Sequence, residues 1–257
     1  MKDFLAQNYQ KLLGAHGLDN FDGLWNLQLE TVDAPNTERG GWSSVCRLEL
    51  EAEGEMFAFY LKRQCNHRSL SWQRPFGEPT FARELRNINA YADAGVAALE
   101  AAFFAERSSR DGRQAILLTV ALDDYQPLSD VVLKWNDYDA NQRKQWSSAI
   151  GHGVAQLHNA HLTHHCLYPK HVYLPRDSEV SPLSVRFIDL EKTRYQLLVW
   201  RDRVADIEAL LRRCNMWTND ERNTLLESYL SHLNRSKSLA EIQSLMLKRQ
   251  TNKAARP

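Results

Sequence analysis

The stretch that decides the fold is residues 157–174, LHNAHLTHHCLYPKHVYL. A helix over about 140–159 is predicted to lead into it, because Trp146, Ile150, Val154 and Leu157 recur at the three- and four-residue steps that share one helix face. A loop follows that holds several imidazole groups and one thiol, Cys166. We therefore expect the chemistry of this protein to depend on that loop.

Two carboxylates and three more predicted helices follow this stretch. Residues 185–192, VRFIDLEK, form a short β-like run that ends in Asp189. Asp206 lies in the next predicted helix, whose apolar face holds Val204, Ile207 and Leu210. The pairs Thr218 and Glu221, and Ser238 and Glu241, have the spacing of capping boxes and predict two more helices. We interpret 248–257 as a basic tail.

The first half of the chain is predicted to be rich in strands. Alternation over residues 42–61 predicts a β-hairpin that Gly40 and Gly41 open, with Cys46, Leu48 and Leu50 on one face. Its second strand runs into Lys62. A helix is predicted over 78–98 because Phe81, Leu85, Ile88 and Tyr91 recur at helical spacing, and it carries two carboxylates, Glu78 and Glu84.

A lobe boundary is expected where this pattern changes. An apolar run at 115–122 predicts a buried strand, and the polar turn at 123–127 follows it. We therefore expect an N-terminal lobe at 1–122 and a helical C-terminal lobe at 123–257.

The order of these parts resembles a protein kinase, and residues 157–174 resemble the kinase catalytic loop with its leading helix. The loop is more similar still to that of the lipopolysaccharide core heptose kinases, the Kdo/WaaP-type family, because Tyr168 and His171 match its motif. The branch of that family called InaA is more similar still. The resemblance covers roughly 40–212 and implies an α+β, bilobal protein-kinase-like fold with a β-rich N-lobe and a helical C-lobe.

The resemblance also assigns roles to residues. It implies an ATP site at the glycine-rich turn with Gly40, Gly41 and Ser43, where small residues let backbone amides approach phosphate. Lys62 would be directed at the α- and β-phosphates and oriented by Glu84, with Glu78 as the rival partner.

The resemblance makes Asp189 the Mg²⁺ ligand and Asp206 the carboxylate that braces the catalytic loop. We expect Lys62, Glu84, Cys166, His171 and Asp189 to line one cleft between the lobes.

The catalytic loop departs from the kinase pattern at two positions. Cys166 stands where a kinase has the aspartate that accepts the substrate proton, and His171 replaces the asparagine that helps to hold Mg²⁺. A thiol is mostly protonated at neutral pH and binds Mg²⁺ poorly. We expect slower phosphoryl transfer, since general-base help contributes about 10²–10⁴ in rate. His165 is a further candidate proton acceptor, and Lys170 a candidate for neutralising the phosphoryl group.

The composition limits the partners and the compartment. Among 257 residues, Lys plus Arg and Asp plus Glu both number 32, so no net charge draws the chain to nucleic acid or an anionic membrane. The four cysteines are widely spaced and follow no signal peptide, which favours a reducing cytoplasm. No apolar stretch approaches the roughly 18 residues of a transmembrane helix, which still allows peripheral membrane contact.

Other classes of function compete with an active kinase. His161, His164, His165, Cys166 and His171 supply zinc-type ligands, although their spacing matches no standard zinc motif. Cys166 with a nearby imidazole would suggest a thiol nucleophile. The main alternative is a pseudokinase that binds nucleotide or a partner as a scaffold without phosphotransfer. The sequence does not name the acceptor, and a sugar of the lipopolysaccharide core is what the resemblance implies.

Overall fold

The structure is a computed structural model, and it describes residues 3–32, 34–37, 40–71, 74–177, 183–234 and 237–254. The chain divides into two compact units. The first comprises Met1–Asn89 and Leu99–Asp123, and the second comprises Ala90–Ala98 and Asp124–Pro257. Strands predominate in the first unit and helices in the second, as expected for the predicted α+β fold.

The first unit is built on an antiparallel sheet in the order β1-β6-β7-β3-β2. Its strands are β1 (Phe4–Leu5), β2 (Trp42–Ala52), β3 (Glu55–Cys65), β6 (Ala101–Ser109) and β7 (Gly112–Val120). A shorter pair, β4 (Arg68–Ser71) and β5 (Arg74–Pro79), precedes α3 (Thr80–Asp93). The first strands are joined by η1 (Gln7–Tyr9), α1 (Gln10–Ala15) and α2 (Phe21–Asn26).

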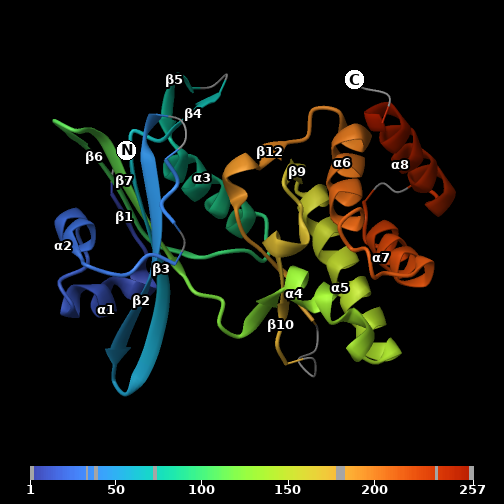
Figure 1. Cartoon of the computed structure of the whole chain (residues 1–257), viewed down its shortest axis with the longest axis horizontal. Helices are drawn as coiled ribbons and strands as arrows, with labels where there is room; N and C mark the ends of the chain where they lie inside the picture. The colour runs from blue at the N-terminus through green and yellow to red at the C-terminus, as the bar shows by residue number, and fades with distance from the viewer. Residues whose placement is uncertain are drawn as a thin grey trace. The chain divides into compact units, whose positions relative to one another are not determined.

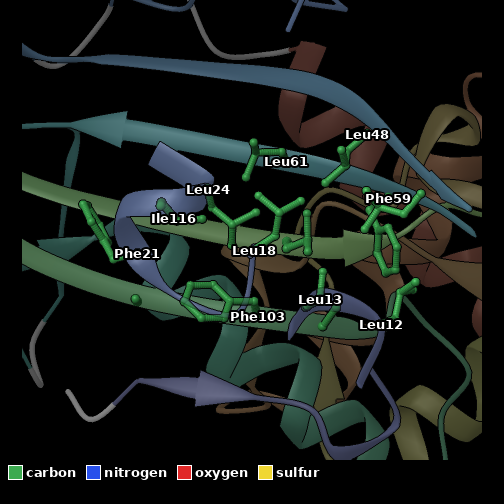
Figure 2. Packing of buried hydrophobic residues seen from close by; sticks show 14 residues of the cluster. Leu12, Leu13, Leu18, Phe21, Leu24, Leu48, Phe59, Leu61, Phe103 and Ile116 are labelled. Carbon is green, nitrogen blue, oxygen red and sulfur yellow. The ribbon is translucent and has the colours of Figure 1, made fainter. Parts of the chain in front are cut away.

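The predicted hairpin is confirmed as β2 and β3, which pair from Trp42 with Cys65 to Ala52 with Glu55. Cys46, Leu48 and Leu50 are buried, because alternate strand residues face the same side of a sheet. Figure 2 shows Leu48, Phe59 and Leu61 from this hairpin packing with Leu12, Leu13 and Leu24. The core that supports β3 thus includes two N-terminal helices that the sequence pattern did not predict.

The helix predicted over 78–98 is shorter than expected. It begins at Thr80, because Glu78 and Pro79 belong to β5, and it ends at Asp93. Gly95 follows with a φ of 68°, a left-handed conformation that glycine adopts without steric cost and that ends helices. The apolar face is as predicted, since Phe81, Leu85, Ile88 and Tyr91 are buried.

The second unit is mainly helical (Figure 1). Its helices are α4 (Leu128–Leu133), η3 (Trp135–Asp137), α5 (Ala140–Asn159), η4 (Pro169–His171), η5 (Leu190–Lys192), α6 (Val199–Leu211), α7 (Asn219–Ser231) and α8 (Leu239–Ala254). Its short strands are β8 (Tyr125–Pro127), β9 (Leu162–Thr163), β10 (Val172–Pro175), β11 (Arg186–Phe187) and β12 (Arg194–Tyr195). Strand β10 pairs with both β8 and β11, and β12 pairs with β9.

Helix α5 agrees with the predicted range and leads directly into the loop of interest. It packs against α7 at Gly151, where a Cβ would collide with the carbonyl oxygen of Leu225. Ser148 and Ser228 are hydrogen bonded across the same contact at 3.2 Å. Both predicted capping boxes are present, at Thr218 with Glu221 and at Ser238 with Glu241.

The interpretation of 248–257 as a tail is wrong for its described part. Helix α8 continues to Ala254, and residues 255–257 lie outside the described residues. The charge of this segment does not keep it away from the rest of the second unit, because one of its basic residues pairs with a buried carboxylate. Arg249 Nε lies 3.5 Å from Glu208 Oε2 on α6, and Glu208 is fully buried.

Candidate functional site

A buried ion pair joins a strand to a helix in the first unit. Lys62 Nζ on β3 lies 2.6 Å from Glu84 Oε1 on α3, and the two side chains are 17% and 6% exposed. Glu78, the rival partner, is instead bonded to Arg86 by two contacts of 2.6 Å. The two carboxylates therefore have different cationic partners, and Glu84 is the one that positions Lys62.

Gln64 explains why Glu84 lies at this place. Its Oε1 atom accepts hydrogen bonds from Thr80 Oγ1 at 2.7 Å and from the Phe81 amide at 3.2 Å. These donors belong to the first turn of α3, whose amides have no partner within the helix. Strand β3 thus holds the start of α3, and Glu84 follows one turn later near Lys62. Sequence reasoning missed Gln64, since its partners lie sixteen and seventeen residues away.

The two glycines before β2 have structural reasons of their own. Gly40 has a φ of 75°, and a Cβ on Gly41 would collide with the carbonyl oxygen of Cys65 and the backbone of Asn66. The Ser43 amide donates to the Asn36 carbonyl oxygen at 2.8 Å, so only the hydroxyl of Ser43 is left as a donor. The nucleotide-binding role of Gly40, Gly41 and Ser43 stays a prediction.

In the second unit, one buried carboxylate holds the start of the loop. Asp206 on α6 accepts the backbone amides of His164 at 2.6 Å and of His165 at 2.9 Å. Asp206 is 2% exposed. These bonds tie two consecutive residues to a helix about forty positions later, and they give Asp206 the bracing role predicted for it.

His158, at the end of α5, supports the same carboxylate. Its Nδ1 atom lies 2.8 Å from the Tyr229 hydroxyl, and its Nε2 atom lies 3.5 Å from Asp206 Oδ2. Burial lowers the pKa of His158 below its ordinary value, so the ring is neutral. Burial alone would raise the pKa of Asp206, but His158, His164 and the backbone amide outweigh it, and this pKa is lowered. The brace is therefore ionised.

His164 links the loop to the segment that carries Asp189. The Cys166 amide donates to its Nδ1 atom at 3.3 Å, and its Nε2 atom lies 2.9 Å from the Ile188 carbonyl oxygen. Because a carbonyl oxygen only accepts, Nε2 carries the proton. Burial lowers the pKa of His164, which agrees with a neutral ring. Both ring nitrogens are therefore used by the backbone.

Cys166 is a buried thiol rather than a thiolate. The residue is 4% exposed, and burial raises the pKa of the thiol. The neighbouring Lys192 and Tyr168 act in the opposite direction without reversing the shift. A protonated sulfur is a weak proton acceptor and a poor ligand for a hard cation.

His171 and Asp189 face each other at 3.2 Å, measured from Nε2 to Oδ2. The His171 Nδ1 atom donates to the Cys166 carbonyl oxygen at 2.8 Å. Burial lowers the pKa of His171, so Nε2 of the neutral ring presents a lone pair towards the carboxylate. The Asp189 side chain is 42% exposed, and the residue has a φ of 58°. Such positive φ values in non-glycine residues are uncommon and cluster at functional sites.

The remaining candidates of the loop are exposed. His165 has a φ of 61°, because its amide and that of His164 both turn towards Asp206. Lys170 lies on η4 and lines a cavity of about 440 Å³ together with Tyr168 and Arg213. The catalytic roles of His165 and Lys170 stay predictions.

The two rival chemistries have little support in this geometry. Among the described residues, no group of three or more His, Cys, Asp or Glu side chains could hold a metal ion. A zinc cluster at the loop is therefore not formed by these residues. A thiol nucleophile needs a lowered pKa, whereas burial raises the pKa of Cys166.

Three features together define a protein-kinase-like protein. A strand lysine is paired with a helix glutamate, and the loop is braced by Asp206. A further aspartate, Asp189, lies between the loop and Asp206 in the sequence. The sequence pattern of the lipopolysaccharide kinase (Kdo/WaaP) family matches residues 22–229. The chain belongs to this family, as the loop motif predicted.

Two relatives extend this comparison. The chain is 28% identical to protein InaA of Escherichia coli (strain K12) over 182 residues, which is 70% of this chain and 81% of InaA. A solved structure titled WaaP in complex with acyl carrier protein is similar to the whole chain, with a TM-score of 0.68, 20% identity and full coverage of both chains. The second likeness supports the fold alone. Across the described ranges, we found no helix with the length and apolar character needed to span a bilayer.

Proposed function

We propose that this protein binds ATP with Mg²⁺ and transfers a phosphoryl group to a sugar of the lipopolysaccharide core or a related acceptor. The observation that carries the proposal is the Lys62–Glu84 pair at 2.6 Å in a member of a kinase family. In protein kinases a strand lysine, held by a helix glutamate, contacts the nucleotide phosphates. Glu84 would keep the Lys62 ammonium extended and ready for that contact.

The pair of His171 and Asp189 fits a divalent cation. A carboxylate and an imidazole lone pair lie 3.2 Å apart, and Asp189 is partly open to solvent. Mg²⁺ is commonly bound by one or two carboxylates and completes its shell with phosphate oxygens and water, so Asp189 is the stronger ligand of the two. Bound Mg²⁺ would neutralise charge on the transferring phosphoryl group. The protein's part is to hold His171 by its bond to the Cys166 carbonyl oxygen and to keep the His171 ring neutral.

The loop then contributes positioning rather than proton removal. Asp206 holds the His164 and His165 amides, and His164 holds Ile188, so both segments keep one arrangement. The neutral thiol of Cys166 accepts a proton poorly. Lys170 would stabilise negative charge on the phosphoryl group, and His165 is an exposed imidazole next to Cys166. We expect turnover to be slower by about 10²–10⁴, the rate factor that a general base contributes.

One observation favours the pseudokinase as the second candidate. Cys166 is 4% exposed and its pKa is raised by burial, so the position of the catalytic base holds no effective base. A scaffold that binds nucleotide needs Lys62, Glu84 and Asp189 but not a proton acceptor. Binding without turnover is the result that would select this alternative.

The test is ATP binding with and without Mg²⁺, followed by ATP turnover with purified rough lipopolysaccharide. Lys62→Met should weaken ATP binding by about 10- to 100-fold, because a charge-assisted contact to phosphate is lost. Lys11→Met is the matched control, since Lys11 pairs with Glu53 at 2.9 Å on the exposed surface. Native ATP affinity in a folded Lys62→Met protein would contradict the proposed site.

A second variant protects the test from a folding defect. Lys62→Met leaves the 6% exposed Glu84 without its cation, whereas the double change Lys62→Met with Glu84→Gln removes that buried charge. The double variant should melt near the native temperature and still bind ATP weakly.

Two expectations from the sequence stay predictions. One is that Lys62 and Asp189 face each other across a cleft, and the other is that the protein is cytoplasmic.

A further inference from the structure

The cavity of about 440 Å³ in the second unit is bounded by the same loop that carries Cys166. One wall is η4 with the residue before it, and another is the end of α4. The third wall is the segment after α6. The lining residues that matter here are Val132, Leu133, Tyr168, Lys170, Arg213 and Met216.

The cavity has an unbalanced positive charge. Lys170 and Arg213 line it, whereas none of its described lining residues is Asp or Glu. Both cations are exposed, and no ion pair within the described part of the chain includes either of them. Arg213 Nη1 donates to the Ala209 carbonyl oxygen at 2.9 Å, which leaves its positive charge unneutralised. A lysine or arginine attracts an anionic ligand most strongly when no nearby carboxylate neutralises its charge. The lining therefore favours an anionic group.

The rim of the cavity is apolar. Leu133 is 81% exposed and Met216 is 46% exposed, and both lie beside the two cations. Exposed large apolar side chains next to a pocket commonly mark a binding surface. A ligand that satisfies both features carries an anionic group close to an apolar part.

A column of stacked groups connects this cavity to the metal-binding pair of the proposed function. The Arg213 guanidinium carbon lies 3.8 Å from the centre of the Tyr168 ring. Tyr168 stacks on His171 with ring centres 5.5 Å apart, and His171 stacks on His164 at 5.9 Å. A ligand on Arg213 would therefore lie at one end of a stack that reaches His171, the neighbour of Asp189.

We propose that this cavity binds the phosphoryl acceptor, and that the acceptor is an amphipathic molecule whose carboxylate or phosphate group contacts Arg213 and Lys170. The acceptor role rests on the proposed kinase function, whereas the binding of an anionic amphiphile does not. Leu133 and Met216 take the apolar part of the ligand.

Binding is measured by calorimetric titration without ATP, using octyl phosphate, octanoate and the neutral octyl glucoside below their micelle concentrations. The two anionic probes distinguish phosphate from carboxylate as the recognised group. At least one of them should bind about tenfold more tightly than octyl glucoside. Arg213→Leu and Lys170→Met should each weaken the favoured probe by about tenfold.

Lys144→Met is the matched control, because Lys144 is an exposed lysine of α5 outside the cavity lining. It should bind the favoured probe with native affinity. Leu133→Glu is an independent variant at a site exposed enough to accept it, and it should weaken the anionic probes more than octyl glucoside. Equal binding of all three probes, no binding of any probe, or equal losses in Lys144→Met would overturn the proposal.

Turnover separates this inference from the proposed function. If lipopolysaccharide is phosphorylated, Arg213→Leu should raise the acceptor KM about tenfold and leave the KM for ATP unchanged. If ATP neither binds nor turns over while the anionic probe still binds through Arg213, the kinase function fails and the anion site stands. An unchanged acceptor KM in an active Arg213→Leu protein would refute the acceptor role.

Discussion

The Lys62–Glu84 pair of the first unit and the Cys166 loop of the second differ in what they keep of kinase chemistry. The first has both charged groups, bonded at 2.6 Å and largely buried. The second has the brace, since Asp206 holds two amides of the loop, but a neutral thiol stands at the position of the base. The comparison teaches that the shape of a catalytic loop depends on groups other than the one that takes the proton. We therefore expect nucleotide binding and proton transfer to be separable in this protein.

The strongest way to sharpen this comparison is to restore the missing base. Cys166→Asp should raise ATP turnover by at most about 10²–10⁴, because a carboxylate accepts a proton that a neutral thiol does not. The measurement is the initial rate of turnover with an acceptor that the native protein phosphorylates slowly. Cys166→Ala is the control and should leave ATP binding nearly unchanged. If Cys166→Asp does not raise the turnover rate with such an acceptor, Cys166 belongs to a different catalytic mechanism. His165 and His171 are then the next proton acceptors to test.

The second unit can also be tested for its part in nucleotide binding. Asp189→Asn removes the anionic member of the pair with His171, and Mg²⁺-dependent ATP binding should weaken by about 2–4 kcal/mol. Titration of ATP at fixed Mg²⁺ and in EDTA measures the difference. Asp220→Asn, an exposed carboxylate in the first turn of α7, should have no such effect. Native Mg²⁺-dependent affinity in the Asp189→Asn protein would end the metal assignment.

The brace can be compared with a similar bond on the same helix. Asp206→Ala leaves two loop amides and the buried His158 without their partner, and it should cost about 3 kcal/mol of unfolding free energy. Asp202 also accepts two amides, those of Leu197 and Leu198, but at an exposed helix start.

Asp202→Ala should therefore cost only about 1 kcal/mol, the usual value of a helix cap. Urea unfolding of both variants measures the difference. Equal losses would show that the loop needs no buried brace.

The smallest expected effect concerns pH. Burial lowers the pKa of His158 in the folded protein, although Asp206 and Asp202 on α6 oppose this and Arg203 adds to it. Tyr229 on α7 faces the other ring nitrogen. The unfolded chain therefore binds a proton at a pH where the folded chain does not. The stability that depends on neutral His158 is present above the ordinary histidine pKa and is lost as pH falls below it.

Between pH 6.5 and 5.5 this loss should be about 1 kcal/mol, and it should be absent in His158→Gln, which keeps a polar group near Tyr229. The measurement is the unfolding free energy of both proteins across this range. His161→Asn changes an exposed histidine and is the control. A His158→Gln protein with the native pH slope would contradict the assignment.

Much of the local structure was determined by the sequence alone. The period of two in β2 placed Cys46, Leu48 and Leu50 in the core, and the helical period placed α5 at its observed range. Both capping boxes were predicted because they join residues only three positions apart. The loop motif was enough to predict the family, which the match over residues 22–229 confirms.

Only the tertiary structure decided which distant groups meet. Both Glu78 and Glu84 were possible partners of Lys62, and the choice depends on Gln64, which holds the start of α3 against β3. The direction in which the pKa of Cys166 is shifted was likewise open, because it depends on burial that no local pattern reports. The end of the chain was interpreted as a tail because its charge suggested solvent, whereas Arg249 lies against a buried Glu208. Short-range spacing reports on period and caps, but partners far apart in sequence are selected by packing.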